Sequence, residues 1–416
     1  MQVSQHRLQR DIEANAAFGS IAVEKGHGRT VLTGTEADKK ARAYFCEQLR
    51  DAGLTVRIDC VGNIVGRWAP ESVNPTAAPV AAGSHLDSVP EGGIFDGPLG
   101  VYAALESVRA MQDADVEPIR PVEVVCFTEE EGQRFDGGLL GSAVATGEMD
   151  SETALSLEDD SGTSLESALS DIGFLGEGRL AADEWHAWLE LHIEQSERLT
   201  EADISAGVVT TITGLSRCGI EITGEANHAG STLMTNRSDA MAAGSEFVLD
   251  IEAAAGECVD TDSATAVATV GKLDVRPNAP NVIPGAVELS LDVRDIRQSS
   301  IEKIVSRAKQ SLDRIETERD VTTEFDRPWN RPPVPMSDRC RTALCEAGES
   351  AEIEIRELHS GAAHDTMHVA NVTDAGLLFV PSRDGISHNP LEWTDWEDCA
   401  AATQVLGGAL KRLASE

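Results

Sequence analysis

Long apolar runs are absent from this chain of 416 residues. No stretch of 18 or more apolar residues occurs, which argues against a membrane-spanning helix of the usual length. The N-terminal sequence MQVSQHRLQRDIEANAAF also lacks the apolar segment of a signal peptide. We therefore expect a cytoplasmic protein that has no membrane partner.

Basic residues are scarce. The chain has 34 Lys and Arg against 71 Asp and Glu, which gives a formal net charge of −37. Because phosphates repel such a charge, we expect no binding to nucleic acids or anionic membranes. The acidic residues are spread along the whole chain, and salt weakens their mutual repulsion, since the Debye length is only about 3 Å at 1 M. The composition therefore predicts a halophilic protein.

Two motifs of nucleophilic and redox chemistry are missing as well. The eight cysteines form no CxxC pair, and no GxSxG sequence occurs. Several cysteines lie within apolar segments, as buried reduced thiols commonly do. A catalytic Ser or Cys therefore has no support in this sequence.

The residues that are present indicate a folded α/β protein. Apolar residues make up 41% of the chain, as in globular domains. Buried strands are predicted at 79–87, 122–127, 187–191 and 376–380, and helices at 35–54 and 100–112. Buried strands separated by helices are typical of a sheet with helices on its faces.

The middle of the chain has a different pattern. Between residues 214 and 326 the predicted order is strand, helix, strand, strand, helix, which is a small α+β unit. The segment PWNRPPVP at 328–335 has the composition of a linker. We therefore expect one large domain formed by 1–212 and 328–416, with a smaller domain inserted at 213–327.

Three consecutive carboxylates raise a question of charge. Glu129, Glu130 and Glu131 follow the apolar segment VEVVCF. Like charges side by side cost free energy unless water or a positive charge compensates them. They can be interpreted as a solvated charge run in an acidic protein, or as part of a metal site.

Other polar residues favour the metal site. His85 and Asp87 lie at the end of the first apolar segment, and His192 follows the third. His388 comes after the fourth, and Asp96 lies in the glycine-rich loop EGGIFDGPLG. Ligands in α/β proteins bind at the carboxyl ends of strands. Imidazole nitrogens and carboxylate oxygens are also the usual ligands of zinc and similar metals.

The number of candidate ligands favours two ions. Paired metals lie about 3.5–4 Å apart and often share a carboxylate, a role that suits the glycine-flanked Asp96. A further carboxylate beside the metal-bound water would be a general base. Neighbouring residues on a strand point to opposite faces, so Glu130 and Glu131 can share one site only if the strand ends before them.

Nine motifs run in one order along nearly the whole chain and together resemble a known family. They are GSHLDSV, GGIFDGPLGV, TEEEGQRF, ELHIEQ, ANHAGST, PNAPNVIPG, DVRD, SGAAHDT and SHNP. The family is the hydantoinase/carbamoylase branch of the zinc-dependent aminoacylase and carboxypeptidase-like amidohydrolases. The resemblance implies an α/β catalytic domain with a mixed sheet, of the di-zinc aminopeptidase-like type. It also implies an inserted ferredoxin-like lid domain that forms a homodimer.

The resemblance implies two metal ions. His85, Asp96 and His192 would hold one, and Asp96, Glu131 and His388 would hold the other, with Asp96 bridging. Zinc is the expected metal, and manganese, cobalt and nickel accept the same ligands.

The same motifs imply the groups that act on the water. Glu130 would be the general base that moves a proton from the attacking water to the leaving nitrogen. Asp87 would orient His85.

Residues implied to bind substrate come mainly from the inserted domain. His228 would polarise the scissile carbonyl or stabilise the oxyanion, and Asn278 and Arg294 would bind the α-carboxylate, which a guanidinium can do in a bidentate manner. Gln195 and Gly361 would line the pocket around the carbamoyl or ureido group. Taken alone, Arg294 would be interpreted as one partner of a surface salt bridge.

The implied reaction is hydrolysis of N-carbamoyl-L-amino acids to the L-amino acid, carbon dioxide and ammonia. Allantoate amidohydrolase and β-ureidopropionase activities are the alternatives, because their substrates also carry a ureido group and a carboxylate. A catalytically inactive, metal-holding dimer is an alternative from another class, and the presence of Glu130 argues against it. Ser196 and Ala363 stand where the family usually has glycine, which bears on substrate identity. His364 and Asp365 lie in the SGAAHDT motif and are expected near the ligands.

Overall fold

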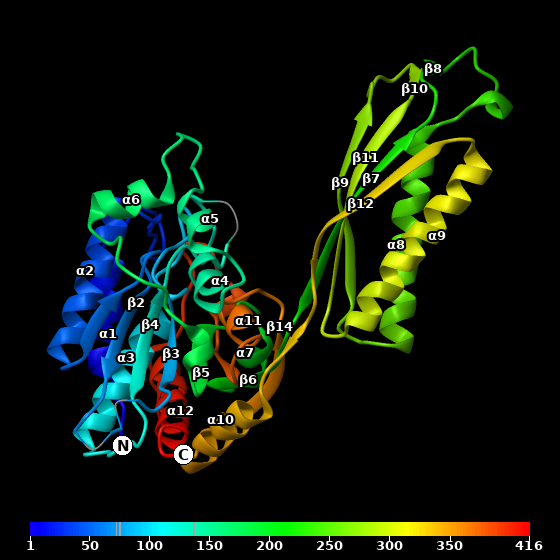
Figure 1. Ribbon diagram of the computed structural model, residues 1–416. Coiled ribbons are helices and arrows are strands. Elements are labelled where there is room, and N and C mark those ends of the chain that lie inside the picture. The colour runs from blue at the N-terminus through cyan, green and yellow to red at the C-terminus, as the bar shows by residue number, and fades with distance from the viewer. Residues whose placement is uncertain (72, 75, 136–137) are drawn as a thin grey trace. The chain divides into compact units, whose positions relative to one another are not determined.

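The computed structural model describes residues 1–71, 73–74, 76–135 and 138–416. The chain forms two compact units, each with its own hydrophobic core (Figure 1). The large unit consists of Met1–Thr210 and Pro335–Glu416, and the small unit is Thr211–Val334.

A mixed sheet forms the centre of the large unit. In the described residues its strands follow the order β1 (Thr55–Ile58), β2 (Ile64–Trp68), β4 (Val122–Phe127), β3 (Val80–His85), β5 (Ala187–Ile193), β15 (Ala375–Val380), β6 (Ala206–Ile212) and β13 (Val334–Pro335), and β14 (Ile355–Ser360) pairs with β6. Strand β3 is parallel to both β4 and β5, and β15 is parallel to β5, whereas β2 is antiparallel to β4. The expected mixed α/β fold is confirmed.

Both faces of this sheet are buried. Val122, Val124 and Cys126 of β4 belong to one hydrophobic cluster, and Val125 and Phe127 belong to another. Because side chains alternate along a strand, these clusters lie on opposite faces. A strand that is buried on both faces has the continuous apolar sequence that predicted it.

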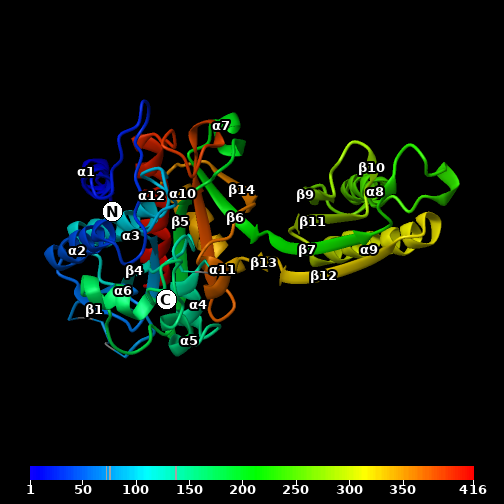
Figure 2. The same ribbon diagram turned by 90° about the horizontal axis from the view of Figure 1, so that it is seen from above.

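Helices cover the sheet (Figure 2). They are α1 (Gln5–Ala16), α2 (Glu36–Asp51), α3 (Pro98–Asp113), α4 (Leu140–Thr146), α5 (Ser151–Leu155), α6 (Leu165–Ile172), α7 (Arg198–Ala202), α10 (Asp338–Ser350), α11 (Thr366–Val369) and α12 (Trp396–Leu413), with short 3-10 turns at Ala182–Glu184 and Arg383–Gly385. Helix α3 is buried from Pro98 to Met111. It packs against the sheet and against α12, which also contacts the sheet, so the start of the helix is fixed in the core.

The small unit has a four-stranded antiparallel sheet. Its order is β12 (Thr322–Arg331), β7 (Gly214–Thr223), β11 (Ala286–Asp295) and β9 (Val267–Arg276). Helices α8 (Ala240–Thr261) and α9 (Gln298–Arg319) cover one face (Figure 1), and β8 (Asn227–His228) pairs with β10 (Val282–Ile283), with a 3-10 turn at Met234–Asn236. Residues of β11 alternate between buried and half-buried, as expected of a sheet with one covered face.

The segment 328–335, which has the composition of a linker, contains the boundary between the two units and is mostly extended strand. Strand β12 continues to Arg331, and β13 occupies Val334–Pro335. Prolines mislead here because β12 is an edge strand, where a missing N–H can face away from its one partner. The pairing with β7 shifts between Asp326 and Trp329, around Pro328.

Candidate metal centre

Three parallel strands bring the first candidate ligands to one edge of the sheet. Strand β3 ends at His85, β5 carries His192 next to its last residue, and β4 ends at Phe127, just before the three glutamates. Because β3 pairs in parallel with both of the other strands, their carboxyl ends meet. The site therefore follows from the sheet topology.

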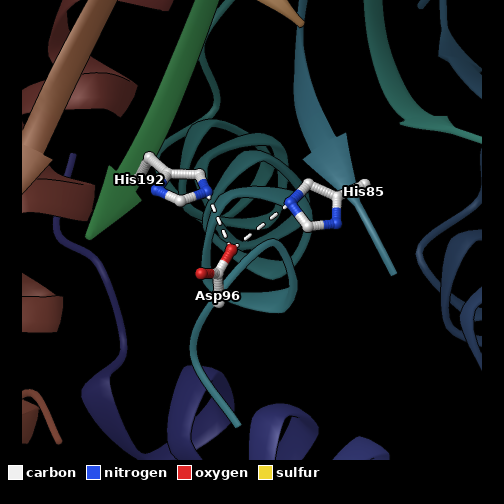
Figure 3. A group of neighbouring side chains, drawn as sticks. All are labelled: His85, Asp96 and His192. Carbon is white, nitrogen blue, oxygen red and sulfur yellow. Dashed lines mark ion pairs between the residues drawn. The ribbon is translucent and has the colours of Figure 1, made fainter. Parts of the chain in front are cut away.

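Asp96 lies between two histidines (Figure 3). Its Oδ1 atom is 3.1 Å from Nε2 of His192 and 3.5 Å from Nε2 of His85. All three side chains are buried, and the two imidazole rings stack with their centroids 5.9 Å apart. One atom from each residue lies within 4.8 Å of the others, as ligands of one ion do.

The second oxygen of Asp96 faces a different group. Nε2 of His388 is 3.4 Å from Asp96 Oδ2 and 3.4 Å from Oε2 of Glu131. One carboxylate thus contributes an oxygen to each of two ligand groups. This arrangement suits a carboxylate that is shared by two ions.

Glu130 and Glu131 both reach the site because the strand has already ended. Glu129, two residues after β4, has φ of 56°, which turns the chain away from the strand direction. Oε2 of Glu130 is 3.6 Å from His85 Nε2. The condition set by the sequence, that the strand stop before these residues, is met.

Glu129 has a structural role of its own. Its Oε1 atom accepts hydrogen bonds from the backbone N–H groups of Arg134 and Phe135, at 2.7 and 2.8 Å. It is buried, and burial raises the pKa of Glu129 to about 7. It therefore fixes the loop that carries the next two glutamates.

We refer to His85, Asp96, Glu130, Glu131, His192 and His388 as the histidine–carboxylate cluster. Although burial opposes protonation, the Glu130 charge and the contacts with Asp87 and Asp96 raise the pKa of His85 well above its usual value. The hydrogen bond to Asp96 is the main reason that the pKa of His388 is raised to about 9.

The two glutamates of the cluster have raised pKa values. Burial raises the pKa of Glu130 well above its ordinary value; the positive charge of His85 opposes this shift, and the negative charge of Glu131 adds to it. Burial also raises the pKa of Glu131, to about 7, with the charge of Asp96 as the next contribution. A positive charge at the centre of the cluster would stabilise the ionised form of both glutamates.

The residues present fit divalent metal ions. His85 Nε2 and Glu131 Oε1 are buried and have no hydrogen-bond partner among the residues that the structure describes. Leaving buried polar atoms unpaired costs about 1–3 kcal/mol each. A coordinated cation would satisfy both, and imidazole nitrogens with carboxylate oxygens are a ligand set for zinc.

Asp87 connects the two halves of the cluster. Its backbone oxygen is 3.1 Å from His85 Nδ1, and its Oδ1 is 3.6 Å from the same nitrogen. Its Oδ2 accepts the Glu131 N–H at 3.1 Å. These contacts direct Nε2 of His85 toward the cluster, as residues behind metal ligands commonly do.

Two of the residues predicted to bind substrate belong to the large unit. Gln195 donates from Nε2 to Asp96 Oδ2 at 3.1 Å and to Ser387 Oγ at 2.7 Å. Gly361 follows the end of β14 and is exposed. Gln195 is therefore in direct contact with the cluster.

The other three belong to the small unit. His228 is exposed, and its Nδ1 accepts the N–H groups of Gly230 and Ser231 at 3.0 and 3.2 Å, which leaves the proton on Nε2. Asn278 is exposed with φ of 52°. Arg294 lies on β11 and donates from Nε to Asp292 at 2.8 Å.

Further residues pack behind the ligands. The ring of His364 is buried 4.5 Å from that of His192, and burial lowers its pKa well below the usual value. Asp365 is fully buried. Sequence reasoning missed Glu392, whose Oε1 accepts the N–H groups of Phe95 and Asp96; its position four residues after His388 was the only signal.

None of the helices in the described part of the chain is long and apolar enough to span a membrane.

Comparison with known proteins places this chemistry in a family. Residues 81–412 match the family model described as Peptidase family M20/M25/M40. An N-carbamoyl-L-amino-acid amidohydrolase of Paenarthrobacter aurescens is 36% identical over 412 residues, which cover 98% of this chain and 97% of that protein. An N-carbamoyl-L-amino acid amidohydrolase of Geobacillus stearothermophilus is 38% identical over 401 residues, which cover 95% of this chain and 96% of that protein.

A solved structure from the expected branch is also similar to this chain in fold and sequence. A hydantoinase/carbamoylase family amidase of Burkholderia multivorans has a TM-score of 0.92 at 35% identity, over 100% of this chain and 99% of that one. The expected resemblance is confirmed, and the chain belongs to the peptidase family M20/M25/M40.

Proposed function

We propose that this protein is a metal-dependent amidohydrolase that cleaves the carbamoyl C–N bond of N-carbamoyl-L-amino acids, releasing the L-amino acid, carbon dioxide and ammonia. The single observation that carries the proposal is the placement of Asp96 between two ligand groups, with Glu130 beside them. Three relatives with this named activity are 35–38% identical to the chain over nearly its full length.

His85, Asp96 and His192 would hold one divalent ion, and Asp96, Glu131 and His388 would hold the other. When bound, such ions lower the pKa of a water ligand toward about 7 and so supply a nucleophile at neutral pH. Zinc suits the ligands best, and manganese, cobalt and nickel are alternatives with the same donor preference.

Glu130 would be the general base. It lies next to His85. Among the described residues it groups with His85 and Glu131, and the two ligand groups that share Asp96 do not include it. Burial raises its affinity for a proton. It takes the proton of the attacking water and returns it to the leaving nitrogen, which lets that nitrogen depart as a neutral molecule rather than as an amide anion.

Residues of the small unit would bind the substrate. The Nε2–H group of His228 would donate a hydrogen bond to the oxyanion. Arg294, with Asn278, would bind the α-carboxylate, and the substrate would then compete with Asp292 for the guanidinium. Gln195 and Gly361 would contact the carbamoyl end.

The small unit would act as a lid and as the dimerisation domain of a homodimer. We assign this role to the inserted domain expected at 213–327, with 1–212 and 328–416 forming the catalytic domain. The strand order β12-β7-β11-β9 with two helices on one face supports a ferredoxin-like assignment.

We also infer a cytoplasmic, salt-adapted enzyme. The eight cysteines are free thiols, and six of them are buried, which fits a reducing compartment. The net charge of −37 fits a medium in which salt screens repulsion between carboxylates.

A related ureido acid is the second candidate substrate. An allantoate amidohydrolase of Bacillus subtilis is 33% identical over 97% of this chain. Ser196, which replaces the usual glycine, donates its hydroxyl to Glu194, and Ala363 is exposed. These two positions are where a different substrate would be accommodated.

Parallel assays would test the proposal. The purified protein, loaded with zinc in concentrated KCl, is given N-carbamoyl-L-methionine, allantoate or N-carbamoyl-β-alanine, and ammonia release is measured. We expect the highest kcat/KM with N-carbamoyl-L-methionine. Turnover of allantoate with none of the carbamoyl amino acid would replace the first candidate by the second. No turnover of any ureido acid would favour a ligand-binding protein.

A further inference from the structure

A buried carboxylate outside the expected ligand set lies against the backbone of Asp96. Glu392 is 1% exposed, and its Oε1 atom accepts the N–H of Phe95 at 2.9 Å and that of Asp96 at 3.1 Å. Both amides lie just before α3, where N–H groups have no partner within the helix. One oxygen of Glu392 therefore holds two consecutive amides of the loop that carries Asp96.

The surrounding chain is built to allow this contact. A Cβ atom at Gly93 would lie 2.3 Å from the carboxyl carbon of Glu392, so a side chain there would exclude the carboxylate. The N–H of Glu392 is held by the Asn389 oxygen at 3.0 Å, and the oxygen of Pro390 accepts the N–H of His27 at 2.7 Å. The turn that presents Glu392 is thus fixed from both sides.

The same turn also carries residues that contact the side chain of Asp96. Ser387 donates from Oγ to Asp96 Oδ2 at 3.1 Å, and Nε2 of His388 lies 3.4 Å from that oxygen. Segment 387–392 therefore contacts both the backbone N–H and the side-chain carboxylate of Asp96. A displacement of the backbone contact would move the oxygens that face the two ligand groups.

We propose that Glu392 is a positioning residue that sets the place of the shared carboxylate by binding the amides of Phe95 and Asp96. This inference rests on the dimetal site of the proposed function. One acceptor oxygen that binds two consecutive amides restrains the backbone on both sides of the Phe95–Asp96 peptide bond, which suits a contact that must hold a ligand in place. Removing residues that orient metal ligands typically weakens metal binding by about 10–100-fold.

Two conservative variants of Glu392 distinguish the position of its acceptor oxygen from its negative charge. Glu392→Gln keeps an acceptor oxygen at the same distance from the backbone and removes the charge. Glu392→Asp keeps the charge and withdraws the oxygens by one methylene. If Glu392 acts by positioning, the aspartate variant binds zinc about tenfold or more weakly than the parent, and the glutamine variant stays within about threefold.

Glu106→Asp is the matched control. Glu106 is also fully buried and accepts a backbone N–H, that of Ser4 at 2.7 Å, and it lies on α3 beyond the first turns of the helix. Its carboxylate is bound by the N-terminal segment, through Ser4 and Arg7, so its shortening leaves the zinc affinity unchanged. Thermal unfolding of all metal-free proteins shows whether each variant folds.

Zinc affinity is measured on metal-free proteins by competition with a chromophoric chelator. Parent-like affinity in Glu392→Asp would overturn the proposal, and so would a tenfold loss in Glu392→Gln, whatever the aspartate variant does. If Glu392→Asp does not fold, the glutamine variant decides, because a tenfold weakening there contradicts positioning by an acceptor. A parent protein that binds no zinc would instead refute the proposed function itself.

Discussion

At the scale of single residues, three consecutive glutamates have three different surroundings. Glu129 is bound by two backbone amides, Glu130 lies beside His85, and Glu131 lies beside His388. The left-handed backbone at Glu129 makes this division possible, because it lets two neighbouring side chains enter one site. The charge run is therefore not a solvated surface feature.

Replacing Glu130 by Gln is expected to abolish most of the turnover. The amide cannot accept the proton of the attacking water, so kcat should fall by about two to four orders of magnitude. The metal content, measured by elemental analysis, should stay at two ions per chain. Normal hydrolysis by this variant would show that another group is the base.

At the scale of elements, the loop before α3 is tightly packed against a predicted metal ligand. Gly97 has φ of 80°, and a Cβ atom there would lie 2.5 Å from the ring of His85. Helix α3 is anchored in the core directly after it, so the loop has little room to adjust.

Gly97→Ala should therefore impair both folding and metal binding. The backbone conformation alone costs on the order of 1–3 kcal/mol for a residue with a side chain. Displacement of His85 should lower zinc affinity as well, which chelator competition would measure. Gly53→Ala is a suitable control, since that glycine also has positive φ, but a Cβ atom there would meet no other atom within 4 Å in the described part of the chain. Equal zinc affinities in the two variants would show that the contact with His85 is unimportant.

Sequence reasoning succeeded where local pattern determines structure. The apolar runs of β3, β4, β5 and β15 end in polar residues, so the strand ends, with the candidate ligands on them, could be located. It did not reveal that β12 continues to Arg331, because prolines on an edge strand give the segment the composition of a linker.

Glu392 was missed for a different reason. It is separated from Asp96 by 296 positions in the chain, and its importance comes from a backbone contact that leaves no residue-type signal. Long-range contacts with main-chain groups are thus the part of the site that one sequence does not reveal.

At the scale of the whole molecule, each unit has its own core and connects to the other through two chain segments. Met336 donates its N–H to the oxygen of Thr210 at 2.9 Å, so the ends that flank the small unit are adjacent in the large one. Likewise, Arg331 pairs with Leu215 near the ends of the small unit. In either unit, a short connection can therefore join the two chain ends.

Deleting residues 211–334 and joining the ends with a short Gly-Ser linker should leave a folded large unit. All six residues of the histidine–carboxylate cluster remain, so we expect two bound zinc ions by elemental analysis. Activity should be lost, because His228, Asn278 and Arg294 are removed. Parent-like kcat/KM in this variant would exclude a catalytic role for the small unit.

We expect the net charge of −37 to make the stability of the protein depend on salt. Raising KCl from low concentration to about 2 M shortens the Debye length to a few Å and weakens the repulsion between carboxylates. The melting temperature, followed by circular dichroism, should rise by several degrees, and removal of metal should destabilise the protein more in low salt than in high salt. A melting temperature that falls with KCl would contradict the inferred adaptation.

The distribution of the cluster along the chain also bears on its order of assembly during synthesis. His85, Asp96, Glu130, Glu131 and His192 leave the ribosome in the first half of translation, whereas His388 and Glu392 emerge only near the end. A nascent chain therefore carries a complete set for one ion long before it can hold the second. Only a completed chain supplies the residues proposed for the second ion, so complete synthesis is a condition for the shared site.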